Sequence, residues 1–160
     1  YTTVIRGIPM TVLLLLFFFV LFVSARNGVP VAIAAFGINS GAYMAELIRS
    51  GINAVDKGQM EAGRSLGFNY MKTMWFIVLP QAFKNILPAL ANEFVVLLKE
   101  TSVAFYIGLG DLMYAGNAIR SATYSAFMPL VAVALIYLVM VLGLSKLVSI
   151  LERRLRTNER

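Results

Sequence analysis

The sequence predicts an all-α integral membrane protein, and two observations predict this fold class: the composition and the long uncharged stretches. Of the 160 residues, 59% are hydrophobic and 14% are charged, and the mean hydropathy is +0.78. A typical soluble domain has about 45–50% apolar and about 25% charged residues. This excess is too large for an ordinary core, so we expect much of the apolar surface to face lipid.

Four stretches are candidates for membrane spans, because about 20 apolar residues cross the hydrocarbon core of a bilayer. The third stretch is less clean than the others, since it carries Glu93 near its far end. A polar loop of about residues 49–82 separates the second stretch from the third. The sequence therefore predicts one transmembrane domain over residues 1–160, with spans at about residues 8–24, 29–45, 83–98 and 122–145.

The Lys and Arg residues indicate the orientation, since cytoplasmic loops carry the excess of positive charge. If the 49–82 loop is cytoplasmic, only three of the 14 basic residues fall outside, namely Arg26, Lys99 and Arg120. Both ends of this chain, including the C-terminus, are then expected in the cytoplasm. The basic tail 152–160 would lie beside anionic lipid headgroups.

The composition excludes several function classes. The chain has no Cys and no His, so it offers no disulfide, Cys/His metal site, Ser-His-Asp triad or Cys nucleophile. It also lacks the G-x-x-x-x-G-K-[ST] motif of a nucleotide-binding P-loop. Its net charge of +6 is dispersed among apolar runs rather than gathered on a basic face. We expect no catalysis, cofactor, metal or nucleic acid for this chain itself.

The 49–82 loop is patterned rather than featureless. Asp56 and Gln59 have the spacing of a helix-capping box, and helix-forming residues run from 57 to 66. Gly67 stands where a left-handed residue would end such a helix. One interpretation is an amphipathic helix resting on lipid headgroups, although its apolar face is weak.

A second short helix is predicted next along the loop. Asn69 can cap it, and it would extend over about residues 70–79. We expect Pro80 to interrupt it, because proline lacks the N–H that a helix interior requires.

The loop residues resemble a known family signature. The residues Glu61-Ala62-Gly63, Gly67, Ile77, Leu79 and Pro80 match the pattern E-A-A-x(3)-G-x(9)-I-x-L-P, with Gly63 in place of the second Ala. This pattern is typical of the membrane subunits of ATP-binding-cassette (ABC) importers. The flanking sequences AYMAELIRSGI, LPQAFKNILPAL and LLKETS, together with Arg6-Gly7-Ile8-Pro9, are similar to the polar amino-acid branch of histidine, arginine and glutamine permeases.

The resemblance implies a methionine-importer-type fold of five helices, of which the first is expected to be missing from this chain. It implies a bacterial inner-membrane transport subunit that alternates between inward- and outward-facing states. It also implies a coupling helix that contacts a separate ATPase, formed by Glu61, Ala62, Gly63, Arg64, Ser65, Leu66 and Gly67. The implied partners are two ATPase subunits, a second permease subunit (identical or paralogous), and a periplasmic or lipid-anchored solute-binding protein.

Charged and polar groups at membrane depth are costly, so they indicate a partner or a wet cavity. In the resembling branch, a Glu placed like Glu93, with Asn92 beside it, is similar to the group that receives a cationic substrate side chain. This favours arginine, lysine or histidine as substrate, with glutamine, glutamate or another polar amino acid as the alternative. A structural ion pair of Glu93 with Lys99 or with a residue on another helix also stays open.

Two further residues are candidates for the substrate pathway. Asn39 lies between Gly37 and Gly41, so its amide could line a cavity or bond across a close helix contact. Glu46 lies near the inner boundary, where a structural pair with Arg49 at i+3 is favoured over a substrate role.

Residues 101–112 are apolar but too few to cross the membrane, which predicts a re-entrant or interfacial segment on the outer side. The resemblance makes this surface a dock for the solute-binding protein, and packing under the outer leaflet is the alternative. A different class of protein, an ion-gradient-driven secondary transporter, is disfavoured because four spans without inverted repeats do not fit that architecture.

Overall fold

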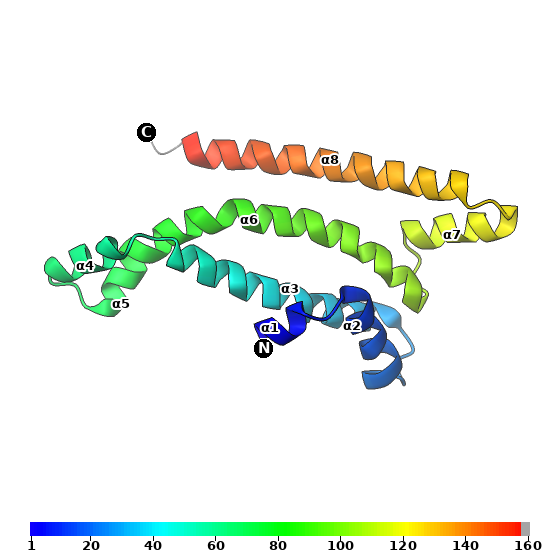
Figure 1. Cartoon of the computed structure of the whole chain (residues 1–160), viewed down its shortest axis with the longest axis horizontal. Helices are drawn as coiled ribbons and strands as arrows, with labels where there is room; N and C mark the ends of the chain where they lie inside the picture. Colours follow the sequence, from blue (N-terminus) through cyan, green and yellow to red (C-terminus); the bar gives the residue numbers. More distant parts are fainter. Residues whose placement is uncertain (158–160) are drawn as a thin grey trace.

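The computed structural model describes the backbone of residues 1–157 and the side chains of residues 1–150. The basic tail expected over 152–160 therefore lies outside the described side chains. Over the described backbone the chain is helical, with three long helices side by side (Figure 1). The elements are α1 (Thr2–Arg6), α2 (Met10–Leu16) with the π-helical turn Phe17–Leu21, α3 (Gly28–Asn53), α4 (Lys57–Ser65), α5 (Tyr70–Thr73) with the π-helical turn Met74–Val78, α6 (Leu79–Glu100) with the 3₁₀ turn Thr101–Ile107, α7 (Leu112–Thr123) and α8 (Phe127–Thr157).

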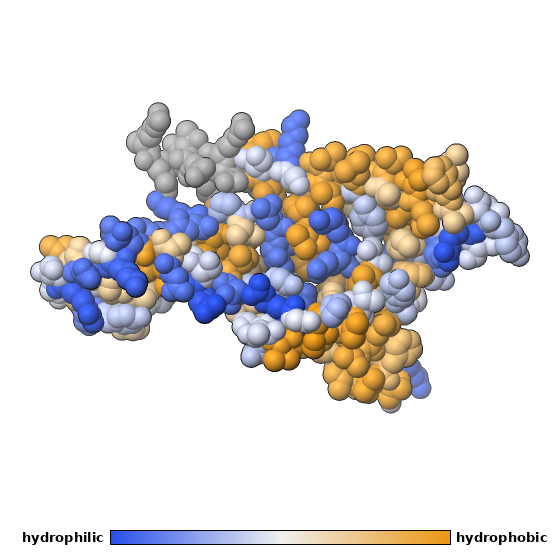
Figure 2. Space-filling view, viewed as in Figure 1, coloured by the Kyte–Doolittle hydropathy of each residue, from blue (hydrophilic) through white to orange (hydrophobic). Residues whose placement is uncertain are grey.

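Three helices within residues 1–157 are long and apolar enough to cross a membrane. They are Gly28–Asn53, the continuous helix Tyr70–Ile107 of 38 residues, and Phe127–Ile150. The first two contain the predicted spans 29–45 and 83–98. The third overlaps the predicted span 122–145, whose first residues lie at the end of α7 and in the turn that follows it. Figure 2 shows apolar surface over α8 and over the α2 region, whereas the α4 end is largely hydrophilic. Exposed apolar side chains such as Leu135, Leu138 and Val139 are what a helix in lipid requires.

The first predicted span differs from the structure. In place of a helix over residues 8–24, the chain forms the 12-residue helix Met10–Leu21. At 1.5 Å per residue it is about 18 Å long, less than the roughly 30 Å of a hydrocarbon core. Pro9 stands at its N-terminus, and at Phe22 the backbone leaves the helical region (φ −120°, ψ 39°).

The segment predicted over 101–112 is divided in the structure. Residues Thr101–Ile107 continue the long helix, which ends where Gly108 takes a left-handed conformation (φ 76°). Asp111 Oδ1 then accepts the Tyr114 N–H at 2.6 Å and so begins α7, a helix that the hydropathy pattern did not predict. Figure 1 places α7 and α4 at opposite ends of the molecule. Helix α8 begins beside α7 and runs back toward the α4 end.

The short helix α2 packs against the start of α3 and the end of the long helix. Leu14 is fully buried in a cluster with Ala32, Ala35 and Ile107. We predict that Leu14→Ala lowers the free energy of unfolding by about 2–5 kcal/mol, because it removes contacts inside a closed cluster. The matched control is Leu16→Ala in the same helix, where the side chain is exposed. Thermal unfolding in detergent should separate the two variants, and equal midpoints would contradict the prediction.

Candidate functional site

Helix α4 begins at a side-chain cap. The Gly58 N–H donates to Asp56 Oδ1 at 2.6 Å, as the spacing predicted. The second half of the predicted capping box does not form, since Gln59 Oε1 instead accepts from Gln81 Nε2 at 3.3 Å. The amide of Gln59 is therefore used to tie α4 to α6 rather than to close its own first turn.

The end of α4 forms the predicted left-handed cap. Gly67 has φ 82°, and its N–H donates to the Arg64 carbonyl at 2.9 Å. The Phe68 N–H donates to the Gly63 carbonyl at 3.1 Å. These two bonds together form a Schellman motif, which satisfies the last carbonyls of the helix. A helix of nine residues is thus closed at both ends.

Most of the side chains predicted to contact an ATPase are accessible. Six of the seven residues are exposed, and Leu66 at the tip has 75% of its surface exposed. Gly63 is the exception, because it is buried against the protein's own chain. A groove of about 360 Å³ runs between α4, the end of α3 and the π-helical turn of the long helix, and charged residues of α4 line it: Lys57, Glu61 and Arg64.

The helix after α4 does not stop where the sequence predicted. Asn69 Oδ1 accepts the Lys72 N–H at 2.9 Å, which confirms the predicted cap. The predicted interruption at Pro80 is wrong, because the helix runs without a break from Tyr70 to Ile107. The π-helical turn Met74–Val78 ends two residues before the proline. Its wider hydrogen-bond pattern accommodates a residue that lacks an N–H and crowds the preceding turn.

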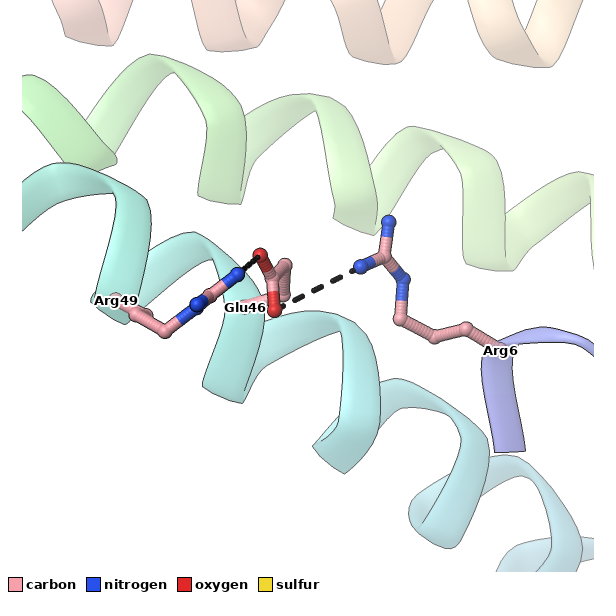
Figure 3. Close-up of polar contacts among 3 residues, drawn as sticks. All are labelled: Arg6, Glu46 and Arg49. Atoms are coloured by element: carbon pink, nitrogen blue, oxygen red, sulfur yellow. Dashed lines mark hydrogen bonds and ion pairs between the residues drawn. The ribbon is translucent and has the colours of Figure 1, made fainter. Parts of the chain in front are cut away.

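The structure places Glu46 in a charge cluster (Figure 3). Arg49 Nη2 donates to Glu46 Oε1 at 2.5 Å, which confirms the predicted i+3 pair. From α1, Arg6 Nη1 lies 3.8 Å from Glu46 Oε2, and its guanidinium lies 5.0 Å from the Tyr43 ring centroid. Two guanidinium groups therefore lie against one carboxylate. The role of Arg6 was missed because nothing in local spacing links it to a residue 40 positions away.

The other predicted pathway residues lie on two helices in contact, α3 and α6. Glu93 is partly buried and Asn92 is exposed. Among the described side chains, Glu93 forms no ion pair with Lys99. The substrate role of Glu93 and a structural pair with a residue on another helix both remain predictions.

Asn39 is 3% exposed, and no hydrogen bond from its amide is found within the described side chains. The glycines on either side do not create a tight helix contact within residues 1–150. A Cβ at Gly37 would meet nothing within 4 Å, and one at Gly41 would lie 3.6 Å from the Tyr1 hydroxyl. Both interpretations of Asn39 therefore remain predictions.

Residues 1–157 match the protein family described as "Binding-protein-dependent transport system inner membrane component". The chain belongs to this family. This permease is 43% identical over 170 residues to "Arginine transport system permease protein ArtQ" of Bacillus subtilis (strain 168), over 99% of this chain and 74% of that protein. It is 41% identical over 157 residues to "Probable glutamine ABC transporter permease protein GlnM" of the same organism, over 97% and 73% of the two chains.

The fold of the permease is also similar to a solved structure, described as "Crystal structure of an amino acid ABC transporter with histidines". The TM-score is 0.89 and the identity is 48%, over 96% of this chain and 73% of that one. The permease is therefore a multi-pass membrane subunit of a bacterial inner-membrane ABC importer for polar amino acids, and not itself an ATPase. Its family implies ATPase and binding-protein partners.

Proposed function

We propose that this permease imports basic amino acids and that α4 is the helix through which separate ATPase subunits drive it. The observation that carries the proposal is that α4 is connected to the helix that bears Glu93. An exposed helix, capped at both ends, adjoins the continuous helix Tyr70–Ile107 that carries Glu93. A force applied at α4 can reach the substrate pathway through one helix.

The choice of substrate rests on Glu93. A carboxylate at membrane depth costs roughly 2.5–3.5 kcal/mol on insertion scales, so it is expected where a cation or a wet cavity compensates. An arginine, lysine or histidine side chain supplies such a cation. Similarity to ArtQ supports this choice, whereas similarity to GlnM keeps glutamine as the alternative substrate.

The assembly is proposed on the same basis. Two ATPase subunits would contact α4 and its copy in a second permease subunit, either identical or paralogous. The side with α4 and the end of α8 would face the cytoplasm, as the basic residues predict. The solute-binding protein would dock at the other end, where residues 101–112 and α7 lie.

The test is uptake by proteoliposomes that contain the permease, the ATPase encoded beside it and the matching binding protein. We expect ATP-dependent, vanadate-sensitive uptake of arginine, lysine or histidine that exceeds uptake of glutamine and glutamate. Proton and sodium ionophores should leave it unchanged. A preference for glutamine would show that the proposed basic substrate is wrong. Ionophore-sensitive uptake without ATP would overturn the coupling proposal.

A further inference from the structure

The buried side of α4 approaches the next helix closely at Gly63. Gly63 is buried, and a Cβ built on it would lie 2.5 Å from Thr73 Cγ2 and 2.9 Å from Thr73 Oγ1. It would also lie 3.1 Å from Ile77 Cδ1. Real Cβ atoms essentially never approach other atoms closer than 3.0 Å. The contact between α4 and α5 therefore exists in this form because residue 63 has no side chain.

Thr73 fills this space and is held there. Its side chain is fully buried, and Thr73 and Leu14 are the largest fully buried side chains among residues 1–150. Its Oγ1 donates to the Asn69 carbonyl at 3.0 Å. A β-branched residue in a helix has few χ1 rotamers, so this bond holds the methyl group against Gly63. Rotating the methyl away would cost the hydrogen bond of a buried hydroxyl.

A second contact of the same kind lies nearby. Gly51, at the end of α3, is buried against Ile86 of α6, and an added Cβ would overlap the Ile86 side chain and lie 3.2 Å from the Ala82 carbonyl. Thr73 and Ile86 both belong to the continuous helix Tyr70–Ile107. Helix α4 and the C-terminal end of α3 therefore both pack against one helix. In each contact, a β-branched side chain of that helix lies against a glycine.

We propose that the Gly63–Thr73 contact is the rigid joint that transmits displacement of α4 to the long helix, which makes Thr73 a positioning residue for coupling ATP hydrolysis to transport. The inference rests on the proposed function of α4. Without this joint, the contacts left between α4 and the long helix include the exposed Gln59–Gln81 bond and the packing of Met60 against the cluster around Val78. The turn at Gly67 would then absorb part of the movement. With it, α4 and the long helix move as one body, because packed side chains cannot slide past each other gradually.

The test is a double-mutant cycle on the reconstituted importer, with transported molecules per ATP hydrolysed as the readout. Gly63→Ala forces α4 away, and Thr73→Ala opens a gap, so each alone should lower this ratio by about threefold or more, as expected for residues in contact. The pair Gly63→Ala/Thr73→Ala brings two methyl groups into the same space and should recover a ratio within about twofold of wild type. ATPase retained on the purified complex should stay at the wild-type level throughout.

The control for an added methyl group is Gly143→Ala in α8, where a Cβ would meet nothing within 4 Å of the described residues. This variant should keep the wild-type ratio. An unchanged ratio in both single variants, a double variant no better than Gly63→Ala, or loss of the ATPase from Gly63→Ala would each overturn the joint. Thr73→Ala adds no atoms, so it tests the proposal even if Gly63→Ala fails to fold.

Failure of the joint is distinguishable from failure of the proposed function. If Gly67→Asp, measured in parallel, abolishes coupling while the Gly63 and Thr73 variants do not, α4 couples by another route. If all of these variants transport normally, the coupling role of α4 itself is wrong.

Discussion

Gly67→Asp should accumulate in the membrane at the wild-type level and lose more than about 90% of ATP-driven uptake. A Cβ at Gly67 would meet nothing within 4 Å in residues 1–150, so the new side chain fits within this chain. The left-handed backbone costs an L-residue about 1–2 kcal/mol, which a long packed helix pair can absorb. An unpaired carboxylate placed in a protein interface costs several kcal/mol, enough to weaken ATPase docking by tenfold or more. ATPase retention during purification in detergent measures this directly.

Gly108→Asp is the matched control for Gly67→Asp. Gly108 has a similar φ of 76°, and an added Cβ would also meet nothing described within 4 Å. It ends the long helix shortly before α7, and α7 lies at the opposite end of the molecule from α4 (Figure 1). Backbone strain is therefore equal, whereas the proposed ATPase surface is untouched. We expect Gly108→Asp to retain the ATPase in detergent. If both variants lost the ATPase equally, backbone strain would explain the loss, and the claim that the ATPase docks at Gly67 would be wrong.

Glu93→Gln should lower uptake of arginine and lysine by about 10- to 150-fold, which corresponds to the 1.5–3 kcal/mol of a hydrogen bond to a charged group. Gln keeps the size and the polar atoms of the side chain and removes only the charge. Uptake of a neutral polar amino acid, where the importer carries one, should stay unchanged in Glu93→Gln while uptake of arginine and lysine falls. Initial rates at saturating binding protein measure the effect at the membrane subunit rather than at capture.

Glu100→Gln is the comparison variant for Glu93→Gln, since Glu100 is a second partly buried carboxylate at the end of the same helix. It lies outside the predicted substrate pathway, so arginine uptake should stay within about twofold of wild type, as for a substitution away from a binding site. Unchanged arginine uptake in Glu93→Gln would contradict the substrate proposal. A similar loss in both variants would indicate that general charge, not a site at Glu93, attracts the cation.

Features that depend on neighbours within one helical turn could be predicted from the sequence. Asp56, Gly67 and Asn69 act on backbone groups two or three residues away, and all three form the predicted caps. The pair Glu46–Arg49 is of the same kind. Composition alone indicated lipid exposure, and the spaced loop motif indicated the family. Pro80 shows the limit of such local rules, because a π-helical turn before it keeps the helix continuous.

The sequence by itself determined the membrane class, the family and the capped helix α4. Only the tertiary structure decided which faces meet: Gly63 against Thr73, Gly51 against Ile86, and Arg6 beside Glu46. It also decided that the first apolar stretch forms the short helix Met10–Leu21. The physical reason is that lipid is as apolar as a protein interior, so hydropathy marks a helix without marking its buried face. Contacts between helices depend on the position and angle at which the helices cross. A single small residue can determine that geometry, and no local sequence pattern predicts it.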